Sequence, residues 1–118
     1  MNNKIVIALG GNALITSKEK VTYTNLLKNI KKTSKNIIPL IKNNQVIITF
    51  GNGPEIGYIL KQNEETKDAK PMPLDVLGAE SQGLIGYLIE EQLLNELRRK
   101  KINKPIIITY RFEKKYTI

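Results

Sequence analysis

The sequence contains no histidine and no cysteine, and their absence excludes several kinds of chemistry. Without cysteine, neither a disulfide framework nor a thiolate metal site can form. Without histidine, the commonest general base and metal ligand is missing as well. Any chemistry must therefore use lysine, carboxylates, amides and backbone N–H groups.

Long apolar runs are also lacking. The apolar run that follows Lys4 meets two glycines before it reaches the length of a signal-peptide core. It is far shorter than the roughly 20 residues that span a bilayer. We therefore expect a soluble, cytoplasmic protein with no membrane partner.

The charge is strongly basic, yet it does not predict a nucleic-acid partner. The chain has 118 residues and a net charge of +8, from 19 basic and 11 acidic residues. Only three of the basic residues are arginine, and the abundance of lysine, isoleucine and asparagine is typical of an AT-rich genome. No nucleic-acid-binding motif accompanies the charge. The length and the 41% of apolar residues predict one compact domain with a real core.

Two β-branched segments each run directly into a glycine turn. The segments are residues 4–9 and 45–50, and the turns are Gly10, Gly11 and Asn12, and Gly51, Asn52 and Gly53. Ligands of open parallel sheets bind at the carboxyl ends of the strands. Glycines there let the backbone approach an anion closely and adopt positive φ, so that N–H groups converge. We therefore predict one shared anion site, although each turn alone could be an ordinary tight connection.

The asparagines of these turns have two interpretations. Asn12 and Asn52 could donate hydrogen bonds to a phosphate or carboxylate oxygen, or hold the turns by bonding local backbone. The turns match neither the Walker pattern nor the dinucleotide-binding fingerprint. The pattern alone therefore predicts an anion site and nothing narrower.

Hydrophobic periodicity predicts the remaining elements. Helices are expected at about 22–41, with a kink at Pro39, at 54–63 and at 76–101, and a third strand at 105–110. Residues 13–21 are expected to form a mobile surface loop. Glycines 78, 83 and 86 indicate close packing of the last helix or a break near a ligand. The order β-α-β-α-α-β predicts an α/β fold with a parallel sheet and right-handed crossovers.

Four blocks of sequence together resemble the N-terminal part of the carbamate kinases, of the amino acid kinase superfamily. They are residues 5–14, residues 51–54 with Gly57, residues 71–75 and residues 81–87. The resemblance covers residues 4 to about 110. It implies a three-layer αβα sandwich with a mainly parallel sheet, truncated, in which residues 1–110 form an incomplete domain and 111–118 a divergent tail.

The resemblance also implies a function. Carbamate kinases transfer a phosphoryl group reversibly between ATP and carbamate, usually making ATP at the end of arginine breakdown. By resemblance, Gly10, Gly11 and Asn12 would meet the transferred phosphoryl group, and Gly51, Asn52 and Gly53 would hold the carbamate or carbamoyl end. The expected ligands are carbamate or carbamoyl phosphate and ATP or ADP with Mg²⁺. Dimers are common in the family, so a homodimer is one expected arrangement.

The sequence departs from the family in two ways. Phe50 stands where the family usually has histidine, and carbamate kinases are more than twice as long. The family lysines that neutralise the phosphates lie beyond this chain, so no catalytic residue and no metal ligand is assigned. The divergent tail is typical of a frameshift or premature stop.

The alternative function is therefore an inactive remnant or an anion-binding fragment. Asp75 and Glu80 are further candidates for polar site residues, or simply exposed acids near a helix N-terminus.

Overall fold

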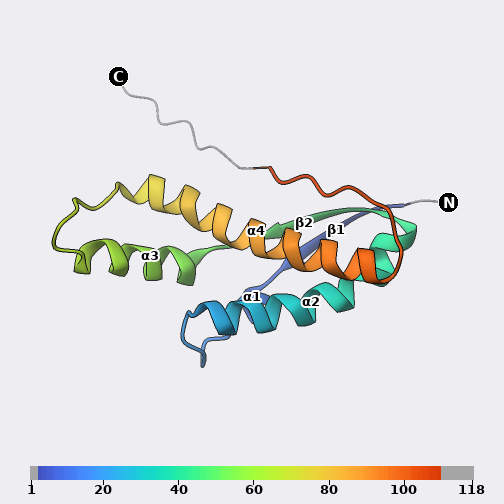
Figure 1. Ribbon diagram of the computed structural model, residues 1–118, viewed down its shortest axis with the longest axis horizontal. Coiled ribbons are helices and arrows are strands. Elements are labelled where there is room, and N and C mark those ends of the chain that lie inside the picture. Colours follow the sequence, from blue (N-terminus) through green and yellow to red (C-terminus); the bar gives the residue numbers. More distant parts are fainter. Residues whose placement is uncertain (1–2, 110–118) are drawn as a thin grey trace, which may run out of the picture.

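The computed structural model describes residues 3–109. Each of two parallel strands is followed along the chain by two helices, in an α/β arrangement (Figure 1). The elements are β1 (Lys4–Leu9), α1 (Gly11–Leu14), α2 (Tyr23–Asn43), β2 (Gln45–Phe50), α3 (Gly53–Glu65) and α4 (Leu74–Arg99). The predicted α/β class and parallel sheet are confirmed. No helix in the described part of the chain is both long and apolar enough to cross a membrane.

The sheet has one covered face and one open face. β1 pairs with β2 in parallel, from Lys4 opposite Gln45 to Leu9 opposite Phe50. Since side chains alternate between faces, Ile7 and Ile48 are half-buried while Val6 and Ile47, on the other face, remain 65% and 59% exposed. Residues 3–109 thus form the sheet and one helical layer of the sandwich, but not the second layer.

The core lies between α2, α4 and the covered face of the sheet. α2 begins at the N-cap Thr22, whose side chain accepts a hydrogen bond from the N–H of Asn25, and it continues through Pro39 to Asn43, two residues beyond the predicted end. A fully buried leucine or isoleucine contributes roughly 1.5–3 kcal/mol. The buried residues that α2 and α4 contribute to this core are Leu26, Ile30, Ile37, Ile38, Ile41, Ile85, Leu88, Ile89, Leu93 and Leu97.

α4 is continuous through its glycines, so they mark close packing and not a helix break. A Cβ built on Gly86 would lie 3.4 Å from Ile108 and 3.8 Å from Phe50. Glycine therefore lets both side chains pack directly against the helix backbone. Phe50 belongs to this packing. It is not among the residues that line the small cavity at the glycine turns, which is described below.

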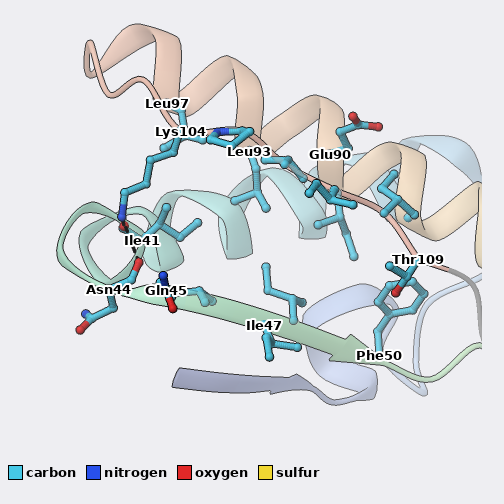
Figure 2. A pocket seen from close by; sticks show the side chains of 18 residues that line it. Ile41, Asn44, Gln45, Ile47, Phe50, Glu90, Leu93, Leu97, Lys104 and Thr109 are labelled. Carbon is cyan, nitrogen blue, oxygen red and sulfur yellow. Dashed lines mark hydrogen bonds between the residues drawn. The ribbon is translucent and has the colours of Figure 1, made fainter. Parts of the chain in front are cut away.

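The third strand predicted at 105–110 is wrong for the described residues 105–109, which are extended but pair with no strand. Lys104 donates hydrogen bonds to the carbonyl oxygens of Ile41 and Asn44 at the end of α2. The segment then runs along α4 and leaves a cavity of about 710 Å³ between itself and β2 (Figure 2). The paired strands of the described residues are therefore β1 and β2 alone. Tyr110 and the predicted tail 111–118 lie outside the described residues.

The predicted surface loop at 13–21 is largely anchored. Ala13 and Leu14 belong to α1, and Leu14 and Ile15 are buried. Side chains of α2 hold this region, because Asn29 donates to the carbonyl of Leu14 at 2.9 Å and Thr33 donates to that of Ala13 at 3.0 Å. The position of the first glycine turn therefore depends on α2.

Glu19 makes the tightest polar cluster in this loop. Its carboxylate accepts hydrogen bonds from the N–H of Thr16, from Asn29 and from the Lys28 ammonium, at 2.8–3.0 Å. These contacts, the Thr16 N–H first, lower the pKa of Glu19 from 4.5 to about 2. They stabilise the ionised carboxylate in the folded chain.

We predict that Glu19→Gln lowers the free energy of unfolding at pH 7. Because the folded pKa is depressed, the stabilisation is present above pH 4.5 and is lost as the pH falls towards about 2. The difference between wild type and variant should therefore narrow over that interval in urea unfolding. Glu64→Gln, at an exposed position of α3, is the control; an equal pH-dependent change there would contradict the assignment.

Candidate functional site

The two glycine turns line one small cavity at the carboxyl ends of β1 and β2. Its volume is about 190 Å³. Because Leu9 pairs with Phe50, the residues that follow them, Gly10 and Gly51, are brought together. The lining residues are Leu9, Gly10, Gly11, Leu14, Ile15, Gly51, Asn52, Gly53, Pro54 and Glu55.

The glycines of these turns are not explained by backbone conformation. None of the described glycines has positive φ, so the predicted left-handed geometry is wrong. Gly10, for example, is extended, with φ −77° and ψ 177°. A Cβ built on Gly10, Gly11, Gly51 or Gly53 would meet no atom within 4 Å. Neither strain nor packing therefore requires glycine here, whereas a ligand close to the backbone would.

Asn52 ties the second turn to α4. Its amide donates to the Ser81 hydroxyl at 2.5 Å and, more weakly, to the Gly78 carbonyl at 3.4 Å. Ser81 is fully buried and donates in turn to Gly78. The side-chain N–H groups of Asn52 thus attach the turn to α4, which is distant in the sequence. They do not bond the local backbone.

The other sequence candidates lie outside the cavity wall. Asn12 is exposed in the first turn of α1 and does not line the cavity. Asp75 and Glu80 are exposed at the start of α4 and do not line it either. Their interpretation as acids near a helix N-terminus is sufficient.

The first turn of α3 places partial positive charge at one wall of the cavity. α3 begins at Gly53 with Pro54 in its first turn, where the missing N–H costs nothing. The first N–H groups of a helix have no partner within the helix, and its dipole adds partial positive charge there. Since residues 53–55 line the cavity, this wall suits an anion.

Glu55 is the residue that sequence reasoning missed. It is only 1% exposed, and neither carboxylate oxygen has a hydrogen-bond partner among the described residues. Burial raises its pKa above the usual value. The available signal was its spacing of four from the buried Ile59, which places both on the inner face of α3.

No lysine or arginine among the described residues lines the small cavity. Its ten lining residues include neither lysine nor arginine, although the whole chain has a net charge of +8. Within residues 3–109 no group of three or more acidic, histidine or cysteine side chains could hold a metal ion. The cavity offers backbone donors and small residues, but neither phosphate-neutralising charge nor metal ligands.

The larger cavity beside β2 is of a different kind. Its walls are mainly aliphatic side chains of β2, α4 and residues 104–109, as Figure 2 shows with Ile47, Leu93 and Leu97. Neither glycine turn lines it. We interpret it as the space left where residues 105–109 do not join the sheet.

A parallel sheet whose strands end in paired glycine turns is the arrangement of the amino acid kinase fold, and solved structures agree. A carbamate kinase from Giardia lamblia bound to AMP-PNP superimposes with a TM-score of 0.82 at 37% identity, over 87% of this chain and 37% of that one. The same kinase bound to citric acid gives 0.81 at 38% identity, over 86% and 33%. The chain thus forms part of an amino acid kinase domain.

Sequence relatives identify the branch of that fold. A carbamate kinase of Pyrococcus horikoshii is 43% identical over 111 residues, and one of Escherichia coli is 43% identical over 89 residues. These matches cover 91% and 75% of this chain, but 35% and 30% of the relatives. No family model matches. The chain is homologous to the carbamate kinases and spans about a third of the length of the curated relatives it matches.

We predict that Gly11→Ala weakens anion binding without loss of stability. The added methyl would enter open space at the cavity wall and would meet no atom within 4 Å, so it costs no packing energy. Affinity for inorganic phosphate, measured by calorimetry, should fall at least about tenfold while urea unfolding shows an equal or higher stability.

Gly57→Ala is the matched control. Gly57 also has no atom within 4 Å of a built Cβ, but it lies on the exposed side of α3, away from the cavity. It should stabilise the chain without changing phosphate affinity. Equal phosphate affinities in wild type and both variants would show that the first turn does not bind the anion.

Proposed function

We propose that this chain is the carbamoyl phosphate-binding part of a carbamate kinase. The complete reaction transfers a phosphoryl group reversibly from carbamoyl phosphate to ADP. A β-phosphate oxygen of ADP attacks phosphorus, the bond to the carbamoyl oxygen breaks, and carbamate leaves as ATP forms. The observation that carries the proposal is the single cavity between the two glycine turns, whose walls leave open space next to the backbone.

The two turns divide the ligand between them. In the proposal, Gly10 and Gly11 face the phosphoryl group, and Gly51, Asn52 and Gly53 hold the carbamoyl end. Asn12, which follows Gly11 but does not line the cavity, is given no role in it. Phosphoryl transfer needs mainly positioning and stabilisation of charge on the phosphoryl oxygens. Fixed backbone N–H groups supply part of both without histidine or cysteine. The Asn52 contacts with α4 keep the second turn in place.

Charge neutralisation has to come from elsewhere. Because no lysine or arginine lines the cavity, the described residues cannot balance the charge of the transferred phosphoryl group. Nor do they form a metal site, so Mg²⁺ would enter with the phosphates of the nucleotide. We propose that these groups and the nucleotide pocket belong to the part of the family fold that this chain does not span.

The wider setting follows from the same proposal. Carbamoyl phosphate and ADP are metabolites of the cytoplasm, and ATP formation from them fits the end of arginine breakdown. A homodimer is the proposed assembly. The competing function is an anion-binding fragment without catalysis, which the small cation-free cavity also allows.

A coupled assay for ATP formed from carbamoyl phosphate and ADP tests the proposal. The chain is measured alone and after co-expression with a second polypeptide carrying the part of the Pyrococcus horikoshii enzyme that it does not match. We expect turnover only from the combination. Gly11→Val should abolish it, and Gly57→Ala should leave it unchanged. If the two polypeptides co-purify but show no turnover, the proposal that the chain is part of an active carbamate kinase is contradicted. The anion-binding fragment without catalysis is then favoured.

A further inference from the structure

Ser81 opens one of the four sequence blocks that resemble the family, and the proposed function gives it no role. It is 0% exposed and lines neither cavity. Its hydroxyl donates a hydrogen bond to the carbonyl of Gly78 at 2.6 Å and accepts one from the side-chain N–H of Asn52 at 2.5 Å. The hydroxyl has one proton, which goes to Gly78, so towards Asn52 it acts only as an acceptor.

The turn that Ser81 holds forms its part of the small cavity from backbone atoms. Gly51 and Gly53 both line the cavity, and glycine has no side chain, so the backbone itself is the wall there. Asn52 lies between them. Its φ of −142° and ψ of 18° belong neither to the strand before it nor to the helix after it. The side-chain bonds to α4 therefore fix the turn at this point.

These bonds also fix the orientation of the Asn52 amide group. The Gly78 carbonyl, 3.4 Å from the amide nitrogen, is a second acceptor beside the Ser81 oxygen. A reversed amide would place its own oxygen against both acceptors. Asn52 is the N-cap of α3 but makes no side-chain cap bond, although an N-cap asparagine usually bonds the first helical N–H groups. Its side chain is thus committed to α4.

α4 is also the support for the helix that follows the turn. Among the described helices and strands, α3 packs against α4 alone, along its first half (Figure 1). The contact passes close to the Ser81 anchor, because a Cβ built on Gly78 would lie 3.9 Å from the side chain of Ile56. No other described element can replace the anchor on this side of the turn.

We propose that Ser81 is a positioning residue for the carbamoyl end of the ligand, acting through Asn52 on the backbone of Gly51 and Gly53. This inference rests on the proposed function, in which the second turn holds that end. Loss of the Ser81 hydroxyl removes the main acceptor for Asn52 and frees the turn. Binding of the carbamoyl end should weaken, whereas the phosphoryl end, held by the first turn, should be affected little.

Calorimetry with two ligands tests the proposal on the 118-residue chain. Phosphonoacetamide is a stable analogue of carbamoyl phosphate with a methylene group in place of the bridging oxygen, and inorganic phosphate lacks the carbamoyl end. Wild type should bind phosphonoacetamide about tenfold more tightly than phosphate, and Ser81→Ala should reduce this preference to about twofold or less at unchanged phosphate affinity. Ser34→Ala, which removes a buried hydroxyl from α2, is the matched control and should keep the preference.

A double-mutant cycle tests whether Ser81 acts through Asn52. Asn52→Ala alone should reduce the preference as Ser81→Ala does, and combining the two should change nothing further. Thermal unfolding checks that each variant is folded. If Ser81→Ala does not fold, Ser81→Cys takes its place with the same expectation, because a thiol is a weaker acceptor than a hydroxyl.

The outcomes separate this proposal from the one beneath it. If wild type binds neither ligand, or binds both equally, the proposed function fails, and with it the inference. The role of Ser81 is overturned, while the proposed function stands, by any of three results in folded variants. These are a preference kept without the hydroxyl, an equal fall in both affinities, and effects of Ser81 and Asn52 that add. Loss of the preference alone, without additivity, supports the inference.

Discussion

The register of β1 against β2 is the constraint on which the site depends. Leu9 lies opposite Phe50 at the end of a parallel ladder, so the chain leaves both strands at the same level and enters two glycine turns side by side. A slip of one residue would exchange the faces of β1, turning Ile7 outward and Val6 inward. The turns would then no longer meet over one cavity. Burial of Ile7 and Leu9 beneath the helices therefore also fixes the geometry of the anion site.

Long-range hydrogen bonds hold the two turns on this frame. Asn29 and Thr33 of α2 bind carbonyls at the end of α1, while Asn52 binds Ser81 and Gly78 of α4. Each turn is thus fixed by one of the two long helices that form the core. The result is a preorganised cavity of backbone and small residues, to which residues 3–109 contribute none of the cations that phosphoryl transfer requires. The division between a positioning part and a charge-supplying part follows from this composition.

Much of this arrangement is predictable from sequence because it is encoded locally. The periodicity of Leu26, Ile30 and Ile37 predicts α2, and β-branched runs before glycine predict both strands and both turns. The third strand fails because pairing depends on a partner at the right distance, and Lys104 and Gly86 hold that segment against helices. The β-branched run at residues 105–109 predicts an extended chain, but it does not show whether that chain pairs with a strand.

The site itself was only partly predictable. Adjacent glycines indicate close backbone approach, but the positive φ often associated with them is absent here. The hydrogen-bond partners of Asn52 are Gly78 and Ser81 of α4. They are 26 and 29 positions further along the chain, so no local pattern shows them. Glu55 escapes notice because glutamate after proline at a helix start is usually an exposed cap. Only the packing of α3 reveals that this one is buried, with no hydrogen-bond partner for its carboxylate oxygens among residues 3–109.

The central claim is that the two glycine turns act as one binding site, and selective ¹⁵N labelling of glycine tests it directly. The chain has eight glycines, and their amide signals can be followed during titration with phosphonoacetamide. The claim predicts that the amide signals of Gly10, Gly11, Gly51 and Gly53 shift together and fit one dissociation constant. The signal of Gly57 should not shift. Shifts confined to one turn, or two turns that titrate with different constants, would contradict it.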